Sequence, residues 1–277
     1  KNSIFLLEDC ALSLGSKFNG VRVGNFGDAA IFSTDKSKPL NTLTGGVLYS
    51  TNCELIDKLK VKSVKLMHMP SSKHKLLFSH LKLERKFYSR SNESRVDTLL
   101  LLKSKIFSKT SAFLDEDFSS KPSRSYPYPS RMPSFLAQLG LYELRNWEKV
   151  ATNRCLILSD FIKLSKNSKT MKFFPKAYND SNLLIIPHRI VWSQPDGETV
   201  RERLSCLIDV SWTWFLKPIV ATKEPLYKFG YKEGSCPKSE LITKGMVNLP
   251  TPSNQNIKKY VKNIVNIVYL INKDGKQ

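Results

Sequence analysis

The sequence has few of the features that define secreted, metal-binding or membrane-spanning proteins. Its 277 residues include five cysteines, an odd number without a CxxC pair, and four histidines without an HExxH pattern. Both observations argue against a disulfide framework and a zinc site. Apolar runs such as residues 99–102 and 183–187 are far shorter than the ~20 residues that cross a bilayer, and residues 1–7 lack the layout of a signal peptide. We therefore expect a cytoplasmic protein with reduced thiols, no metal and no transmembrane segment.

Acidic residues are also scarce, with 24 Asp and Glu against 44 Lys and Arg, which gives a formal net charge of +20. Much of this excess lies in residues 58–109, where 14 basic residues accompany three acidic ones. Interspersed aromatic residues such as Phe78 and Tyr88 make a nucleic-acid-binding module one interpretation. Because no known nucleic-acid-binding motif accompanies the charge, we favour a solvated, lysine-rich helical insertion and no specific nucleic-acid partner.

The hydrophobic patterning predicts a mixed α/β protein. Strands are expected at residues 3–7, 29–33 and 46–50, with a further extended segment at 182–192. Helices are expected at residues 136–162 as one long amphipathic helix, at 198–209, and from about 253 to the end of the chain. The strand at 3–7 is expected to be buried, and the last helix to bury Ile257, Val261, Ile264 and Val268. We expect two domains, with the boundary between them near residue 150.

Residues 7–50 combine side chains that suit one kind of catalysis. Asp9 follows an apolar run, at the carboxyl end of a predicted strand, where the sites of α/β sheets gather. Lys38 lies in the loop after the next long strand. An enzyme that uses pyridoxal phosphate needs a lysine to form a Schiff base and a carboxylate to keep the pyridine nitrogen protonated. Spacing alone fits an exposed lysine and a helix-capping aspartate as well, and it leaves both interpretations open.

The same segment contains a longer pattern: EDxAxxxG, then GxxxGxxGDxAxFS, a lysine five residues after that serine, and a GG pair seven residues further on. This pattern resembles the DegT/DnrJ/EryC1/StrS family of sugar aminotransferases, which are fold-type I pyridoxal phosphate enzymes. The matching residues are Glu8, Asp9, Ala11, Gly15, Gly20, Gly24, Gly27, Asp28, Ala30, Phe32, Ser33, Lys38, Gly45 and Gly46.

The resemblance implies an α/β fold of the aspartate-aminotransferase type, fold type I. Residues 1–150 are then the C-terminal portion of the large cofactor-binding domain, with a basic insertion at about 58–117, and residues 151–277 are a small C-terminal domain. In the family the aspartate lies deeper in the chain than Asp9 does here. A sequence that begins at Lys1 is therefore expected to be N-terminally incomplete.

The resemblance also implies the roles of individual residues. Asp9 would bind the pyridine nitrogen of pyridoxal 5'-phosphate, Ser33 would hydrogen-bond its phosphate, and Lys38 would be the Schiff-base lysine and proton shuttle. Lys36 is a rival, but the spacings to the serine and to the GG pair select Lys38. Arg131, in an RM segment ahead of the long helix, is a candidate for contact with the cofactor phosphate of the neighbouring subunit.

The implied activity is ping-pong transfer of an amino group, from glutamate or glutamine, to a nucleotide-linked keto-sugar. The product would serve the synthesis of a surface polysaccharide or a secondary metabolite, and the enzyme would be a homodimer with shared sites. Leu12 stands where the family usually has a polar residue beside the cofactor. This departure supports an alternative, a catalytically degenerate homologue that binds a sugar nucleotide without turnover.

Overall fold

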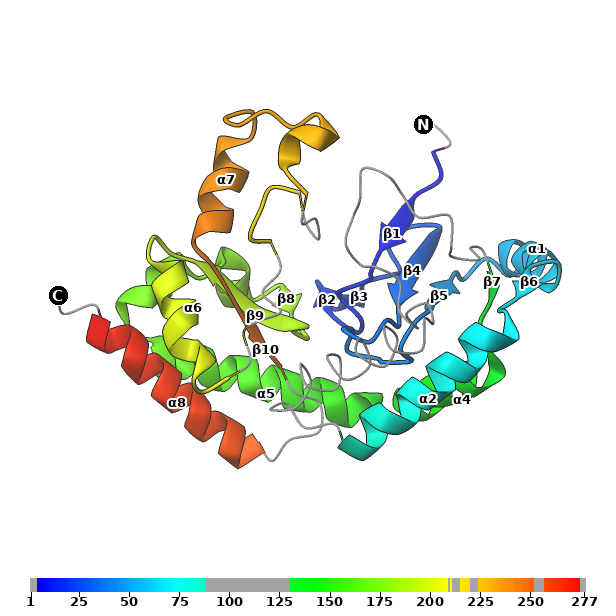
Figure 1. Ribbon diagram of the computed structural model, residues 1–277, viewed down its shortest axis with the longest axis horizontal. Coiled ribbons are helices and arrows are strands. Elements are labelled where there is room, and N and C mark those ends of the chain that lie inside the picture. Colours follow the sequence, from blue (N-terminus) through cyan, green and yellow to red (C-terminus); the bar gives the residue numbers. More distant parts are fainter. Residues whose placement is uncertain are drawn as a thin grey trace.

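The computed structural model describes residues 4–87, 130–208, 210, 215–219, 224–251 and 257–274. Half of the basic insertion and the expected start of the last helix therefore lie outside the described residues. Helices form an arc, and the strands stand on its inner side (Figure 1). The arc consists of α2 (Ser71–Phe87), α4 (Ser134–Arg145), α5 (Trp147–Ser165) and α8 (Ile257–Asp274). Among the described helices, none is both long and apolar enough to cross a membrane.

The N-terminal sheet has the order β1-β4-β5 and consists of β1 (Leu7–Asp9), β4 (Ala29–Ser33) and β5 (Gly46–Tyr49). β1 runs parallel to β4, with Asp9 opposite Ile31, so both strands end at the same edge of the sheet. β5 is antiparallel to β4. β4 and β5 lie where the sequence predicts them.

The prediction of a buried strand at residues 3–7 is wrong in both position and burial. The strand lies at 7–9, and the side chain of Leu7 is 48% exposed. Within the described residues β1 pairs with β4 alone, so the apolar run gains little cover. An apolar run indicates that burial is favourable, but the neighbouring elements decide whether it happens.

A second small sheet connects the N-terminal and C-terminal parts of the chain. It contains β2 (Lys17–Phe18), β3 (Val21–Arg22) and β8 (Leu183–Leu184) in the order β3-β2-β8. The N–H of Asn19 donates to the carbonyl of Asn182 at 2.8 Å, which extends this contact. Segments far apart in sequence thus lie side by side at the centre of the molecule (Figure 1).

The predicted single helix over residues 136–162 is two helices, because α4 and α5 meet at Asn146. The backbone of Asn146 leaves the helical region, with φ −95° and ψ 0°, and its side-chain amide donates to the carbonyl of Tyr142 at 2.9 Å. An asparagine that bonds to local backbone competes with helix continuation. Leu144, near the end of α4, is 46% exposed.

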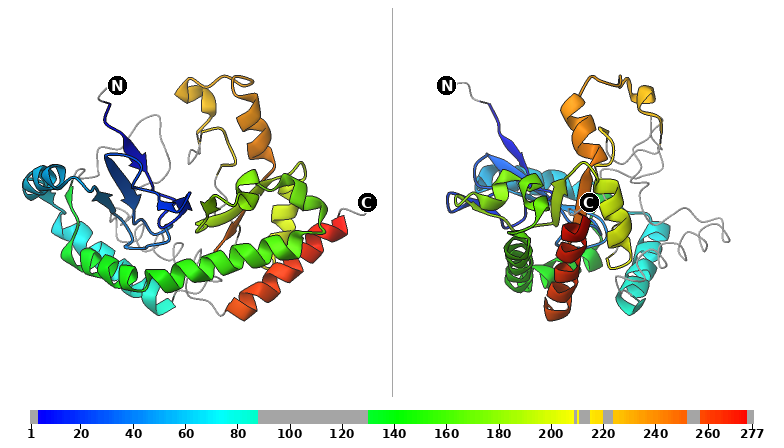
Figure 2. Two further views of the ribbon diagram at one scale, coloured as in Figure 1. Left: turned by 180° about the vertical axis from the view of Figure 1, so that it is seen from behind. Right: turned by 90° about the vertical axis from the view of Figure 1, so that its left-hand side faces the viewer.

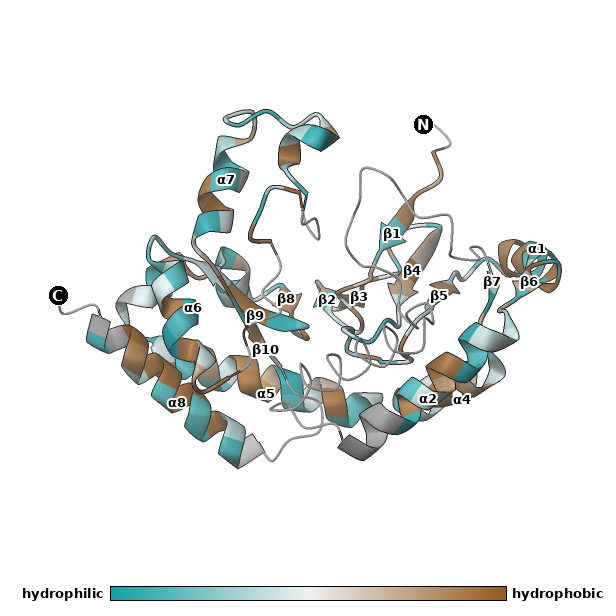
Figure 3. Cartoon of the chain, viewed as in Figure 1, coloured by the Kyte–Doolittle hydropathy of each residue, from teal (hydrophilic) through white to brown (hydrophobic). Residues whose placement is uncertain are grey.

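The C-terminal part of the chain encloses the larger hydrophobic cluster. Here β9 (Arg189–Ser193) pairs antiparallel with β10 (Met246–Pro250), and α6 (Gly197–Ser205) lies beside them. Bands of apolar residues on α5 and α8 accompany these strands (Figure 3), and the two helices run side by side in the end view of Figure 2. Both Ile264 and Val268 are buried as predicted. The extended segment is found as β8 with β9, and the helix predicted at 198–209 is found as α6, which already ends at Ser205.

The remaining described elements are short or peripheral. They are α1 (Cys53–Val64), β6 (Met67–His68), β7 (Ser130–Arg131), α7 (Pro237–Lys244) and the 3-10 helices η1 (Lys169–Phe173), η2 (Lys176–Asn179) and η3 (Leu226–Phe229). Both α1 and α2 belong to the basic segment, whose described part is therefore mainly helical.

One packing contact of this core is testable. A Cβ added at Gly197 would lie 2.1 Å from the carbonyl oxygen of Gly245, a backbone atom. We expect Gly197→Ala to lower the free energy of unfolding by about 3 kcal/mol. Gly230→Ala is the control, because Gly230 has φ +74° but no atom within 4 Å of an added Cβ, so backbone strain alone costs about 1 kcal/mol. Urea titrations of both variants check this difference, and equal losses would contradict it.

Candidate active site

Two neighbouring strand ends form one edge of the candidate site. Asp9 is the last residue of β1, and its Oδ1 accepts a hydrogen bond from the N–H of Ala11 at 3.0 Å, which turns the chain sharply after the strand. Ser33 is the last residue of the parallel strand β4, two positions beyond the residue opposite Asp9. The carboxylate and the hydroxyl therefore lie at adjoining ends of one sheet.

Glu8 holds the glycine-rich turn that leads into β4. Its carboxylate accepts hydrogen bonds from the N–H groups of Gly24 (2.8 Å), Phe26 (2.6 Å) and Gly27 (2.7 Å). Burial by itself raises the pKa of Glu8, but these three donors stabilise the carboxylate, and on balance the pKa is lowered. Sequence reasoning identified Glu8 only as part of a motif. Its structural role could have been suspected from the glycines at 24 and 27, which leave the backbone N–H groups accessible.

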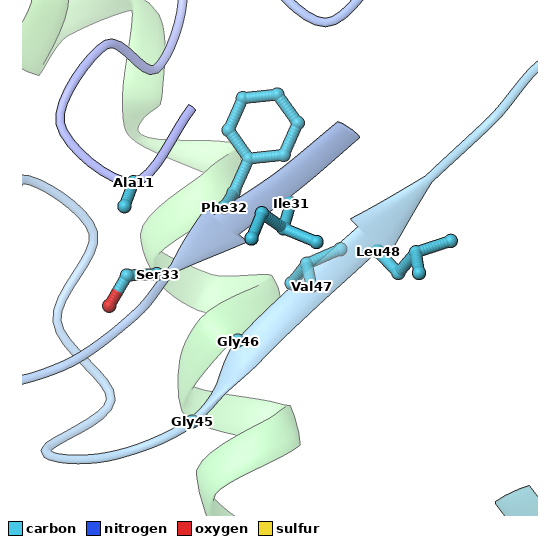
Figure 4. Close-up of a pocket in the computed structure, with 8 residues that line it drawn as sticks. All are labelled: Ala11, Ile31, Phe32, Ser33, Gly45, Gly46, Val47 and Leu48. Atoms are coloured by element: carbon cyan, nitrogen blue, oxygen red, sulfur yellow. The ribbon is translucent and has the colours of Figure 1, made fainter. Parts of the chain in front are cut away.

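A pocket of about 370 Å³ lies along β4 and β5. Figure 4 shows its lining residues, which are Ala11, Ile31, Phe32, Ser33, Gly45, Gly46, Val47 and Leu48. Of the predicted site residues, Ser33 belongs to this lining, whereas Asp9, Lys38 and Arg131 do not. The hydroxyl oxygen of Ser33 accepts the N–H of Asp35 at 3.4 Å, which ties the pocket to the loop that follows.

Lys38 lies half-buried in that loop, residues 34–44, which we call the lysine loop. The two threonines at its neck are buried, and the hydroxyl of Thr42 donates to the Oγ1 of Thr34 at 2.6 Å. The N–H of Lys36 donates to the carbonyl of Leu43 at 3.1 Å, and the N–H of Lys38 donates to the carbonyl of Asp35 at 2.9 Å. These bonds give the lysine loop a defined shape.

Arg131 lies apart from the pocket, but its neighbour in sequence supports the end of the lysine loop. Arg131 is exposed and pairs with His68, where β6 and β7 run parallel. The next residue, Met132, packs so closely on Gly45 that a Cβ there would lie 2.2 Å from the methionine Cε. The tip of the methionine could move aside, but the φ of +123° at this position favours glycine.

His188 is a candidate site residue that sequence reasoning missed. It precedes β9, and its Nδ1 is buried without a hydrogen-bond partner among the described residues. Burial, together with the charges of Arg154, Arg189 and Lys38, lowers the pKa of His188 to about 3. A neutral imidazole from the C-terminal half of the chain thus lies within electrostatic range of Lys38. Its position directly after the apolar run 183–187 was the available signal.

These donor types fit pyridoxal phosphate. The cofactor needs a carboxylate for its pyridine nitrogen, hydrogen-bond donors for its phosphate and an amine for its aldehyde. Asp9, Ser33 and Lys38 offer these groups from two adjoining strand ends and the loop that follows them. Their order and spacing are those on which the sequence resemblance depends.

Solved structures define the class of protein. An aminotransferase of Helicobacter pylori involved in the biosynthesis of pseudoaminic acid matches with a TM-score of 0.61 and 18% identity, over 98% of this chain and 60% of that chain. A putative sugar aminotransferase of Streptococcus pneumoniae in its PLP form matches with a TM-score of 0.58 and 16% identity, over 97% and 58%. The fold is therefore that of fold-type I, pyridoxal phosphate-dependent aminotransferases, as the resemblance implied.

The family follows from the sequence match. The DegT/DnrJ/EryC1/StrS aminotransferase family matches residues 1–269, and the chain belongs to this family of pyridoxal phosphate-dependent transferases. A UDP-4-amino-4,6-dideoxy-N-acetyl-beta-L-altrosamine transaminase of Campylobacter jejuni is 43% identical over 61 residues, 22% of this chain and 16% of the relative. GDP-perosamine synthase of Vibrio cholerae is 38% identical over 64 residues, 23% and 17% of the two chains. The chain spans about three fifths of the length of the related structures.

The hydrogen bonds of Glu8 predict a specific pH dependence. We expect Glu8→Gln to lower the free energy of unfolding at pH 7 by about 2 kcal/mol, because a charged acceptor of backbone N–H groups is lost. Since the pKa of Glu8 is lower in the folded than in the unfolded protein, its contribution is complete above the unfolded-state pKa and disappears as the pH falls through the folded-state pKa. The difference between the variant and the wild type should therefore shrink in acid.

Urea titrations at several pH values measure this effect. Glu54→Gln is the matched control, because Glu54 is exposed and forms a surface pair with Lys58. That control should change stability by at most about 0.5 kcal/mol. A Glu8→Gln deficit that stays constant down to acidic pH would argue against the assigned role.

Proposed function

We propose that the protein is an aminotransferase that uses pyridoxal phosphate to transfer an amino group, with glutamate as donor, to a nucleotide-linked keto-sugar. The observation that carries this proposal is the arrangement of Asp9 and Ser33 at adjoining strand ends, with Lys38 in the loop that follows. The relatives named above are a transaminase of a UDP-linked sugar and a GDP-perosamine synthase, which supports a nucleotide-linked sugar as the acceptor. The product would enter polysaccharide or secondary-metabolite synthesis.

The side chains divide the chemistry between them. When bound, pyridoxal phosphate supplies a ring that withdraws electrons and stabilises negative charge at the carbon that bears the amine. The carboxylate of Asp9 would hold the proton on the pyridine nitrogen, and the hydroxyl of Ser33 would donate to the phosphate. The amine of Lys38 would hold the cofactor covalently in the resting enzyme and, once released, would move the proton of the carbon that bears the amine.

Arg131 suits a role in a neighbouring subunit. In its own chain it is exposed and outside the pocket lining. We propose that the enzyme is a homodimer in which Arg131 contacts the cofactor phosphate of the other subunit. All five cysteines are free thiols, which supports a location in the reducing cytoplasm.

We also propose that the domain boundary lies near residue 150, with the cofactor-binding portion before it and the small domain after it. The two buried clusters support this division. The larger cluster begins at Ile157, whereas the smaller one contains Leu43, Leu77 and Leu136.

The alternative of a catalytically degenerate homologue is not favoured, because named transaminases and sugar-nucleotide synthases are among the relatives. Leu12, the departure that motivated it, is 44% exposed and absent from the pocket lining. The part of the basic segment at 88–109 lies outside the described residues, and no observation on the described part favours a nucleic-acid-binding module.

Covalent trapping tests the assignment of Lys38. The protein is incubated with pyridoxal phosphate, reduced with borohydride and mapped by peptide mass spectrometry. We expect the adduct on Lys38, and we expect Lys38→Ala to lose it together with at least about a thousandfold of the amino transfer from glutamate to UDP- or GDP-linked keto-sugars. Lys36→Arg should retain the adduct. An adduct on Lys36, or none in the wild type, would refute the assignment.

A further inference from the structure

The inner face of α2 packs against the lysine loop. Leu77, in the middle of α2, is 2% exposed and forms one buried cluster with Leu43 of the lysine loop and Leu136 of α4. Met132, which packs on Gly45 at the end of the loop, borders the same cluster. A helix from the basic insertion therefore contacts the segment that carries Lys38.

The backbone of Leu43 shows how firmly this contact holds the loop. Its φ is +69°, in the left-handed region that disfavours residues other than glycine. The conformation is kept by a hydrogen bond from its N–H to the Oδ1 of Asn41 at 2.8 Å, by its carbonyl, which accepts the N–H of Lys36, and by burial of its side chain to 1% exposure. Truncation of Leu77, the partner of Leu43 in the buried cluster, would leave the backbone strain at Leu43 without this compensating burial.

A second residue of α2, His80, is also buried and lies within electrostatic range of the loop. His80 lies one turn after Leu77 and is 3% exposed. Burial, and then the charge of Lys36, lower the pKa of His80 to about 4, so it is neutral near pH 7. Leu77 thus packs with Leu43, and the buried His80 lies within electrostatic range of Lys36.

The helix itself is held in place by α4. The ring of Phe135 lies 4.9 Å from that of His74 and 5.5 Å from that of Phe78, the latter edge to face. Aromatic pairs at these separations are attractive beyond their buried area. α2 and α4 therefore form one support beneath the lysine loop.

We propose that Leu77 is a positioning residue: by packing with Leu43 it lets α2 clamp the lysine loop, which fixes the amine of Lys38 relative to Asp9 and Ser33. The inference rests on the proposed function, in which Lys38 is the residue that binds the cofactor. A displacement of about 1 Å of a reacting group can cost on the order of a hundredfold in rate, so a lysine carried on a loop needs such support.

The first test measures the clamp itself by hydrogen exchange at the amides of Lys36 and Thr42, which bond to Leu43 and to Thr34. Leu77→Ala should accelerate both amides at least about tenfold, because the cavity favours local opening of the loop. Leu204→Ala is the matched control, since Leu204 is a helical leucine with 1% exposure in the other cluster. It should leave the exchange rates of the two amides within about twofold of the wild-type rates. Leu77→Met should restore these rates to within about threefold of the wild type.

The second test measures positioning as the rate of borohydride-trapped attachment of pyridoxal phosphate to Lys38, with the exposed Lys58 as internal reference. Leu77→Ala should slow attachment at Lys38 at least about tenfold and leave Lys58 unchanged, whereas Leu204→Ala and Leu77→Met should change neither. If Leu77→Ala does not fold, Leu77→Val provides a smaller deletion with the same expected direction.

The outcomes separate the two proposals. Unchanged exchange in Leu77→Ala, or equal acceleration in Leu204→Ala, overturns the clamp. Faster exchange with an unchanged attachment rate overturns the positioning role. If wild-type Lys38 reacts no faster than Lys58, the proposed function fails and the positioning role fails with it, even where exchange confirms the contact between α2 and the lysine loop.

Discussion

The three hydrogen bonds that Glu8 accepts are the interaction on which the N-terminal part of the site depends. They join the end of β1 to the turn at residues 24–27, and that turn leads directly into β4. One contact therefore fixes both the start of β4 and its register beside β1. Asp9 follows Glu8 in sequence, and Ser33 ends β4, so their relative position is set by the same bonds. A partly buried carboxylate is stable there because backbone donors replace its water.

The C-terminal half of the chain contributes to the same region through an internal charge. Arg154 on α5 is 5% exposed, and its Nη1 donates to the carbonyls of Pro187 at 2.9 Å and His188 at 3.0 Å, and to the hydroxyl of Thr251. These bonds fix the backbone ahead of β9. They also place a positive charge that, in addition to burial and together with the charges of Arg189 and Lys38, lowers the pKa of His188 and keeps it neutral. The surroundings of Lys38 thus depend on residues from both halves of the chain.

The sequence predicts those features that local chemistry determines. A strand at 29–33 follows from its patterning, and Asp9 and Lys38 are candidates because one cofactor requires such side chains, although the resemblance was needed to add Ser33 and to assign the roles. The break at Asn146 was missed because the apolar period continues through it, and only the side-chain bond to the helix shows the interruption. The position of His188 after an apolar run was a signal that was missed, but its neutral state arises from burial and from distant charges, which the local sequence does not reveal.

Local bonds and distant packing serve different purposes in the lysine loop. The bonds between Thr34 and Thr42 are directional and define the shape of the loop, but they do not fix its orientation relative to the sheet. Burial of Leu43 against Leu77 is not directional, yet it anchors the loop to a separate element. On the same helix Lys75 and Lys82 are exposed. One face of α2 therefore carries the positive charge that dominates the composition, and the opposite face, apolar or neutral, supports the lysine on which the chemistry depends.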